Sequence, residues 1–320
     1  LLVLFRIGEQ LRGKVFGMLW ALGYAGSILP HLYFRSGIID PWFNLFIFLG
    51  LHALITLVHR DPQRDPNALN ARRDRHAWLA GLFFGLAVLT KGPVGALVPA
   101  LVLIAYWAWN RFRFVLRWRR LGIIAFAATL TVSAWALIDL LRNGSDFMVA
   151  FFWRQVAMLT TEDAGHGGFF GYHFVVLLVG CFPSSVFALQ ELLRPTRSAD
   201  EAENDHRRWM VILFWVVLIL FSIVKTKIVH YSSLCYFPLT YLAALQLEPV
   251  WRKQDGFGWS RFLLGGLGTL IALIVIAVPF AGMNVELIKP LFAQDPFALA
   301  NLDADVNWTG IESLAGLMLL

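Results

Sequence analysis

The stretch "RSGIIDPWFNLFIFLGL", residues 35–51, places Asp40 at the start of a run that is otherwise almost entirely Phe, Leu, Ile and Trp. Asp followed by Pro is a typical helix start, because Asp caps well and Pro tolerates the first helical position. An unpaired carboxylate in hydrocarbon costs several kcal/mol, so this acid is expected at a bilayer edge, where it is capped, paired or used.

The composition around this stretch indicates a membrane protein. Of the 320 residues, 58% are hydrophobic and 15% are charged, and the mean hydropathy is +0.64. Soluble domains are about 45–50% apolar and about 25% charged. The net charge of +6 is spread over short basic clusters between apolar runs. This pattern is typical of basic loops in a polytopic protein, and it excludes a nucleic-acid-binding face.

The apolar runs predict an all-α polytopic membrane protein with about nine complete spans in a single transmembrane domain, residues 1–320. The chain begins in "LLVLFRI" and stops in "SLAGLMLL", so the sequence predicts a fragment truncated at both ends. The candidate spans are 15–34, 41–58, 77–90, 93–109, 121–140, 172–189, 209–224, 232–246 and 262–281.

The basic residues predict the topology of these spans. Loops 6–14, 59–76, 110–120, 190–208 and 247–261 hold 20 of the 27 Lys and Arg residues, and they are expected in the cytoplasm by the positive-inside rule. The alternate loops, with 35–40, 141–171 and 282–312 as the outer ones of interest, then face the periplasm or cell exterior. Within 141–171, Arg154 and Gln155 interrupt an aromatic run. A spanning helix would bury both, so a helix over 147–159 is expected to lie in the outer interface.

The outer loops also collect the residues that could carry chemistry. "KTKIVHYSS", residues 225–233, sets Lys225, Lys227, His230 and Tyr231 between two apolar spans. Point charges and hydrogen-bond donors of this kind make a phosphate-binding set. Lys91, in another outer turn, and Arg154 are expected to converge on the same anion.

Each of these positions also has a simpler interpretation. Lys91 could extend to the surface from a helix end, and His166 could be an ordinary solvated loop residue. Asp40 could serve only as the cap of its helix.

Four segments resemble a known superfamily in order and in side of the membrane. They are "RSGIIDPWFNLFIFLGLHAL", "GLAVLTKGPVGALVP", "EDAGHGGFFGYHFVVLLVGCFPSSVFAL" and "FSIVKTKIVHYSSLCYFPLTYLAAL", within residues 11–246. The chain resembles the membrane glycosyltransferases of the lipid A aminoarabinose-transferase and protein O-mannosyltransferase superfamily, which have the C-type glycosyltransferase fold.

The resemblance implies a glycosyltransferase of the bacterial inner membrane. It would take a sugar from a polyprenyl-phosphate donor on the outer face and transfer it to a lipid, glycan or protein. By this analogy Lys91, Arg154, Lys225, Lys227, His230 and Tyr231 would bind the donor phosphate. His166 matches a histidine that ligates a divalent metal in some members, with Glu162 as a second candidate ligand. Asp40 matches a secondary acid that orients the acceptor or a metal, and the principal acid of the superfamily lies in an outer loop upstream of Leu1.

Two other functions compete with this one. A transporter or flippase of lipid-linked sugars would place charges near the middle of several spans, often in broken helices, whereas these spans are nearly free of charge. A non-catalytic scaffold would give no reason for desolvated lysines in two separate turns. The one-sided polar set therefore favours the enzyme.

Overall fold

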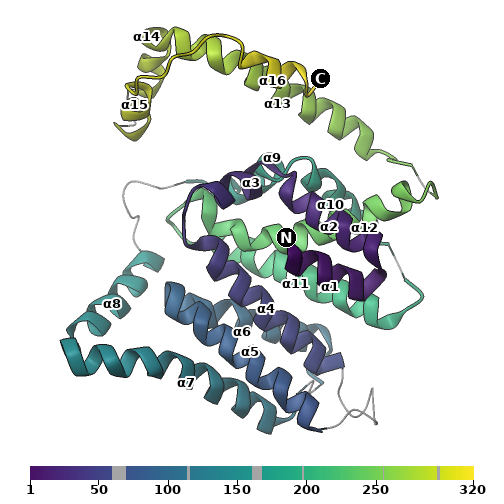
Figure 1. Ribbon diagram of the computed structural model, residues 1–320, viewed down its shortest axis with the longest axis vertical. Helices are drawn as coiled ribbons and strands as arrows, with labels where there is room; N and C mark the ends of the chain where they lie inside the picture. The colour runs from purple at the N-terminus through teal and green to yellow at the C-terminus, as the bar shows by residue number, and fades with distance from the viewer. Residues whose placement is uncertain (60–69, 114–115, 161–167, 197, 255, 294–295) are drawn as a thin grey trace. The chain divides into compact units, whose positions relative to one another are not determined.

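The structure is a computed structural model, and it describes residues 1–59, 70–113, 116–160, 168–196, 198–254, 256–293 and 296–320. Two compact units, Leu1–Gln254 and Asp255–Leu320, make up the chain. The first unit holds α1 (Leu2–Arg12), α2 (Lys14–Ala25), α3 (Ile28–Arg35), α4 (Asp40–His59), α5 (Asn70–Lys91), α6 (Val94–Trp109), α7 (Trp118–Asn143), α8 (Asp146–Thr160), α9 (Tyr172–Gly180), α10 (Ser184–Leu193), α11 (Glu201–Ile223), η1 (Val229–Cys235) and α12 (Tyr236–Trp251) (Figure 1). The second unit holds α13 (Ser260–Met283), α14 (Val285–Ile288), η2 (Lys289–Phe292), α15 (Pro296–Leu302) and α16 (Ser313–Leu317).

The helices confirm an all-α polytopic membrane protein. Among the described residues, α4, α7, α11 and α13 are long and apolar enough to cross a membrane, and α6 is a shorter apolar helix. Two bent pairs, α2 with α3 at 70° and α9 with α10 at 119°, raise the number of spans to six if each pair is one span. The count of nine spans in one domain remains a prediction.

Pro183 explains the sharper bend. Pro183 immediately precedes α10 and has no N–H to continue the ladder of α9. The continuous span predicted at 172–189 is therefore two short helices, joined at Cys181 to Pro183. The span predicted at 15–34 is likewise divided, between Ala25 and Ile28.

Small residues let α5 approach α7 closely. A Cβ built on Gly81 would meet the carbonyl oxygen of Ile124 and lie 2.6 Å from the Cβ of Ala127. A Cβ on Gly85 would lie 2.6 Å from the Cβ of Thr131. Glycines four residues apart form the small-residue face that membrane helices use for close packing, because lipid supplies little hydrophobic driving force between them.

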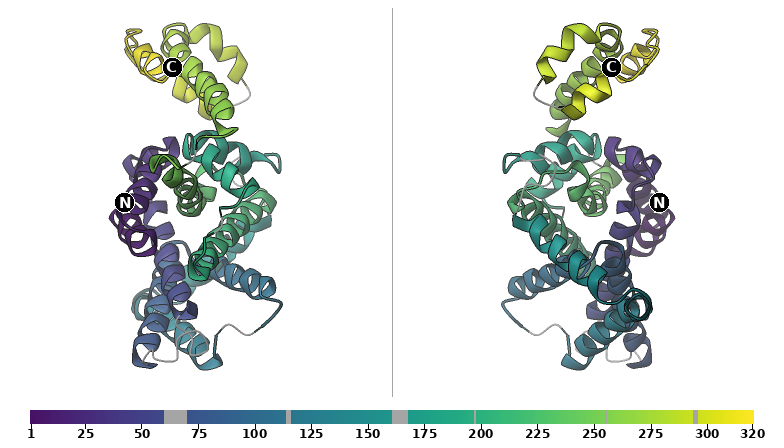
Figure 2. Two further views of the ribbon diagram at one scale, coloured as in Figure 1. Left: turned by 90° about the vertical axis from the view of Figure 1, so that its right-hand side faces the viewer. Right: turned by 90° about the vertical axis from the view of Figure 1, so that its left-hand side faces the viewer.

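The core of the first unit centres on α12, with α2 packed beside it (Figures 1 and 2). Trp20 is fully buried, and its ring lies edge-on to those of Phe48 and Tyr241, with centroids 5.9 and 5.1 Å away. Its indole Nε1–H donates to the carbonyl of Phe237 at 3.1 Å. A buried Trp needs such a partner for its one polar atom, so this bond fixes α2 on α12.

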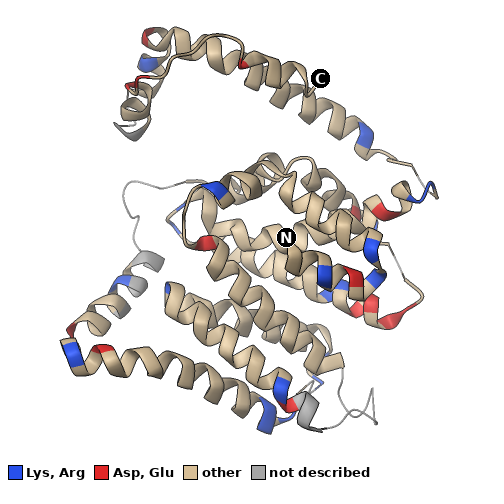
Figure 3. Ribbon diagram, viewed as in Figure 1, with Lys and Arg blue, Asp and Glu red and all other residues tan. Residues whose placement is uncertain are grey.

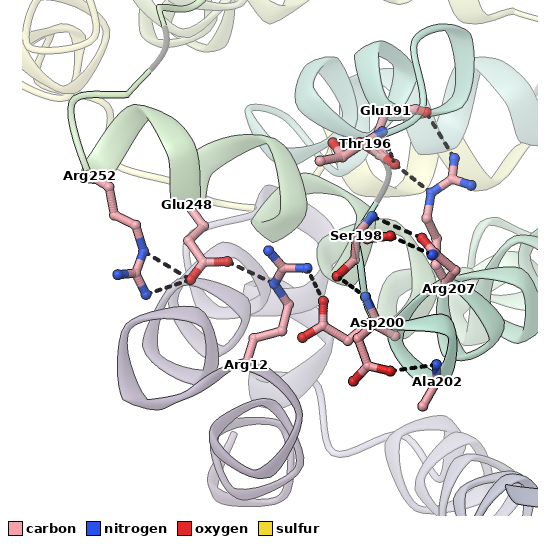
Figure 4. Close-up of polar contacts among 11 residues, drawn as sticks. Arg12, Glu191, Thr196, Ser198, Asp200, Ala202, Arg207, Glu248 and Arg252 are labelled. Atoms are coloured by element: carbon pink, nitrogen blue, oxygen red, sulfur yellow. Dashed lines mark hydrogen bonds and ion pairs between the residues drawn. The ribbon is translucent and has the colours of Figure 1, made fainter.

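Charged residues of the first unit gather at helix ends, and the middles of the long helices are nearly uncharged (Figure 3). At one end, Arg12 pairs with Glu203 at 2.6 Å and with Glu248 at 2.9 Å, and Arg252 joins Glu248 at 2.9 Å (Figure 4). These residues come from α1, α11 and α12 and belong to, or border, the loops predicted to be cytoplasmic. The ionic contacts therefore hold three helices together at this end of the first unit.

A separate helix forms within residues 141–171, the loop predicted to be outer, as the sequence predicted. After α7 the chain turns at Gly144, whose φ is 75°, and α8 runs from Asp146 to Thr160. Its position in the plane of the interface remains a prediction. In the second unit, α16 packs on α13, where Gly316 contacts Ala272 and Ile276.

Candidate functional site

An ion pair joins the start of α4 to the end of α5. The Lys91 Nζ donates to Asp40 Oδ1 at 2.6 Å. The Asp40 side chain is 7% exposed and that of Lys91 is 26% exposed. Asp40 begins its helix, as predicted, but the described contacts of its carboxylate are with Lys91 rather than with the backbone of α4. Because Asp40 is buried, its carboxylate needs a nearby positive charge, and the Lys91 ammonium supplies it.

The ion pair opens onto a cavity of about 380 Å³. Its lining comes from α4, the α5–α6 turn, α8, the end of α11 and η1. Five residues predicted from sequence line it together: Asp40, Lys91, Arg154, His230 and Tyr231. Four segments far apart in the sequence therefore meet around one cavity, in which these polar side chains stand among apolar ones such as Phe43 and Val98.

The cavity also has residues that the sequence analysis missed. Asn44 lies one turn after Asp40 on α4, and its Nδ2 donates to the Ser233 Oγ at 2.7 Å. Thr90, Phe151 and Phe221 complete parts of the wall. An isolated Asn one turn after the acid of an otherwise apolar helix was the available signal, since a buried amide requires a partner.

Hydrogen bonds fix the turn that carries His230 and Tyr231. Ser233 Oγ donates to the carbonyl of His230, and Ser232 Oγ lies 3.1 Å from the Nδ1 of His173. The ring of Tyr231 packs on Phe221, with centroids 5.4 Å apart. His230 and Tyr231 therefore line the cavity from a turn that is tied to α4 and α9.

The pKa of His230 is lowered from its ordinary value of 6.5, chiefly because the ring is buried. The nearby Asp40 carboxylate acts in the opposite direction, and Lys91 lowers the pKa further. A histidine with a lowered pKa is neutral near pH 7, so His230 offers the cavity one N–H donor and one acceptor rather than a cation.

The two lysines of "KTK" lie in different surroundings. Lys225 is exposed and does not line the cavity. Lys227 is 5% exposed, and its Nζ donates to the carbonyls of Phe221, Ser222 and Val224 at 3.1, 2.6 and 2.5 Å. His166 and Glu162 lie outside the described residues.

The described residues of the site do not form a cluster of metal ligands. Among the described residues, no three His, Cys, Asp or Glu side chains gather as a metal site would require. Asp40, the acid of the cavity, already holds an ammonium group at 2.6 Å. The described donor set therefore fits an anion next to Lys91 better than a metal ion next to Asp40.

A second polar cluster lies at the other end of α4. Asp205 of α11 accepts from the hydroxyl of Tyr106 at 2.9 Å and from Arg208 at 2.9 Å, and it pairs with His59 at 2.7 Å. Asp40 and His59 are the two ends of a 20-residue helix, about 28 Å apart at 1.5 Å per residue. The cavity therefore lies at one end of α4, and the cluster of Asp205, His59 and Arg208 lies at the other end.

A larger cavity, of about 850 Å³, lies among α9, α10 and α11. Its charged residues are Arg207 and Arg208, which pair with Glu191 and Asp205. None of the described residues predicted from sequence lines it. Five of them line the smaller cavity instead.

Known proteins similar to this chain share its sequence over most of its length. No protein-family model matches the sequence. The undecaprenyl phosphate-alpha-4-amino-4-deoxy-L-arabinose arabinosyl transferase of Pseudomonas aeruginosa (strain LESB58) is 30% identical over 275 residues, which are 82% of this chain and 45% of that protein. The protein of the same name from Pectobacterium atrosepticum is 28% identical over 314 residues, 94% of this chain and 52% of that protein. The chain spans about half the length of the curated relatives that it matches.

Solved structures share the fold. The crystal structure of ArnT from Cupriavidus metallidurans bound to undecaprenyl phosphate matches 99% of this chain and 59% of that one, with a TM-score of 0.63 and 17% identity. The apo structure of the same protein matches the same shares, with a TM-score of 0.64 and 18% identity. With its helical bundle, its one-sided cavity and these relatives, the chain belongs to the C-type membrane glycosyltransferases of the aminoarabinose transferase superfamily.

Proposed function

We propose that this chain carries the donor-binding membrane region of a glycosyltransferase that moves a sugar from a polyprenyl-phosphate carrier to an acceptor at the periplasmic face of the bacterial inner membrane. The acceptor is a lipid, glycan or protein. The donor of the named relatives, undecaprenyl phosphate-alpha-4-amino-4-deoxy-L-arabinose, is the first candidate for this chain as well.

The observation that carries the proposal is the Asp40–Lys91 pair in a cavity that also holds Arg154, His230 and Tyr231. Lys91 donates to one oxygen of Asp40 at 2.6 Å, and an ammonium group has three N–H donors. The remaining donors, with the Arg154 guanidinium, the Tyr231 hydroxyl and neutral His230, can surround a phosphate monoester or diester. Lys225, which is exposed nearby in sequence, would meet the same headgroup from the loop.

The chemistry follows from where charge develops. An acceptor hydroxyl attacks the anomeric carbon and gives its proton to a carboxylate base. The bond from that carbon to the phosphate oxygen breaks, and polyprenyl phosphate leaves with an additional negative charge. Cations fixed in a low-dielectric cavity stabilise this charge more in the transition state than in the ground state. Lys91 and Arg154 therefore lower the barrier by holding the leaving group, and Asp40 orients the acceptor hydroxyl beside it.

A divalent metal at His166, with Glu162, belongs to the same proposal. Both residues lie beyond the described part of the chain, and no step above depends on a metal. Calorimetric titration of the purified protein with Mg²⁺, Mn²⁺ or Zn²⁺, compared with His166→Ala, would decide whether that loop binds one.

Transfer is tested with the full-length protein in lipid nanodiscs and a polyprenyl-phosphate sugar. Mass spectrometry measures both free polyprenyl phosphate and the glycosylated acceptor. Asp40→Asn and Lys91→Ala are expected to lower transfer by about 100-fold or more, as the loss of other preorganised charge-stabilising groups does. The matched control is Asp139→Asn, because Asp139 accepts a hydrogen bond from Asn143 on its own helix, α7, and does not line the cavity.

Undiminished transfer by Lys91→Ala would contradict the proposed site. Movement of the donor lipid across a vesicle membrane, with no sugar released, would instead support the transporter interpretation.

A further inference from the structure

We propose that Lys227 is a positioning residue: its ammonium caps the C-terminus of α11 and thereby fixes the turn that presents His230 and Tyr231 to the cavity. The catalytic consequence rests on the proposed function, whereas the cap itself does not. The sequence grouped Lys227 with the phosphate ligands, so the inference assigns it a different role from that of Lys91.

The donors of Lys227 are fully used. An ammonium group has three N–H bonds, and this one has three carbonyl acceptors, those of Phe221, Ser222 and Val224. The side chain is buried, and Lys227 does not line the cavity. No N–H of Lys227 remains for a phosphate while these contacts persist.

The acceptors are the groups that a helix end leaves unpaired. α11 ends at Ile223, so the last carbonyls have no partner within the helix. A cation at this end also interacts favourably with the negative end of the helix dipole. Lys227 meets both needs from four residues beyond the helix, which makes the chain fold back on itself.

The fold-back shapes the wall of the cavity. Phe221 and Val224 carry two of the three capped carbonyls, and both line the cavity. Phe221 also packs on the ring of Tyr231. The Lys227 cap therefore holds the first part of the turn, just as the Asn44–Ser233 bond at 2.7 Å holds its last part.

A glycine closes the other side of the lysine stem. A Cβ built on Gly168 would lie 2.8 Å from the Cγ of Lys227 and 3.3 Å from its Cβ. Only a residue without a side chain leaves the stem in place, so Gly168 and Lys227 are coupled although 59 residues separate them. Gly168→Ala is accordingly a second way to disturb the cap without changing its charge.

The experiment compares charge with hydrogen bonding. Lys227→Gln keeps N–H donors but removes the charge, and Lys227→Met removes both. Lys91→Gln and Lys91→Met are the matched pair at a lysine that faces the cavity. Amide hydrogen exchange of 224–233 is measured in the substrate-free full-length protein, and kcat and KM for the polyprenyl-phosphate sugar are measured separately.

We expect Lys227→Met to raise exchange in 224–233 and to lower kcat by about tenfold, the scale of one or two lost hydrogen bonds. Lys227→Gln should recover most of both losses. The two Lys91 variants should raise exchange in 224–233 less than Lys227→Met does, and they should lose transfer equally. Gly168→Ala should raise exchange over the same residues, and this variant keeps the test decisive if Lys227→Met does not fold.

Equal loss of transfer in Lys227→Gln and Lys227→Met, with unchanged exchange in both and in Gly168→Ala, would overturn the proposal and indicate a charge contact with the phosphate. If the wild-type protein transfers no sugar, the proposed function fails, but the exchange measurements still decide whether Lys227 is a cap.

Discussion

Lys91 and Asp40 are 51 residues apart in sequence, yet the Nζ and Oδ1 atoms are 2.6 Å apart. The pair joins the start of α4 to the end of the antiparallel helix α5. Its acid is buried and its base is a quarter exposed, so the lysine retains access to the cavity while it neutralises the carboxylate.

Breaking this pair from one side should destabilise the protein more than removing both charges. Lys91→Met leaves a buried carboxylate without a partner, with an expected cost of about 1–3 kcal/mol after allowance for the exposure of the lysine. The double variant Asp40→Asn/Lys91→Met should recover part of this loss. Unfolding in a mild detergent measures it, and strictly additive single losses would show that the pair contributes no coupling.

The lowered pKa of His230 predicts that the folded protein loses stability at acidic pH. Because burial lowers its pKa below 6.5, the folded state favours the neutral ring. This contribution is therefore fully present above a pH of about 6.5, and it declines as the pH falls below that value towards the folded-state pKa. His230→Gln should flatten the dependence of the melting temperature on pH below about 6.5. An unchanged profile would mean that another group sets the acid limit.

The α5–α7 contact should not tolerate a methyl group. Gly81→Ala would press the new Cβ onto the Ile124 carbonyl and onto Ala127, and the expected loss is about 1–3 kcal/mol, typical of overpacking. Gly122→Ala on α7 is the control, because nothing lies within 4 Å of its Cβ. That control should be neutral or slightly stabilising, since Ala favours a helix. Equal melting temperatures for the two variants would contradict the close approach.

Single-cysteine labelling tests the predicted sides of the membrane. Ser36→Cys, in the outer loop 35–40, should react with an impermeant maleimide in intact spheroplasts, because the residue is exposed. Arg113→Cys, also exposed but in an arginine-rich loop, should react only after permeabilisation. The native Cys181 and Cys235 are buried and give a low background. Labelling of both variants from the same side would refute the topology.

Sequence patterns were sufficient to predict the fold class and to identify five of the residues that line the cavity. Long apolar runs between charged breaks predict membrane helices because the bilayer leaves few other ways to satisfy a backbone. The alternation of these spans placed Asp40 and Lys91 on one side, and it did the same for His230. The aromatic run with Arg154 predicted a separate helix, which the structure has as α8.

The sequence by itself determined that this is a polytopic helical membrane protein, and it predicted that the candidate site residues lie at one face. Those properties follow from local rules of hydropathy and charge, which act along the chain. The tertiary structure alone decided which cation meets which anion. Lys91 and Lys227 are chemically identical. The first pairs with Asp40 and lines the cavity, while the second donates its three N–H bonds to carbonyls at the end of α11. Hydropathy could not predict the bends in α2–α3 and α9–α10 either. It measures how apolar a segment is, but it does not show where a helix must break in order to pack. Pairing depends on distances between segments that are far apart in sequence, and only the packed bundle sets those distances.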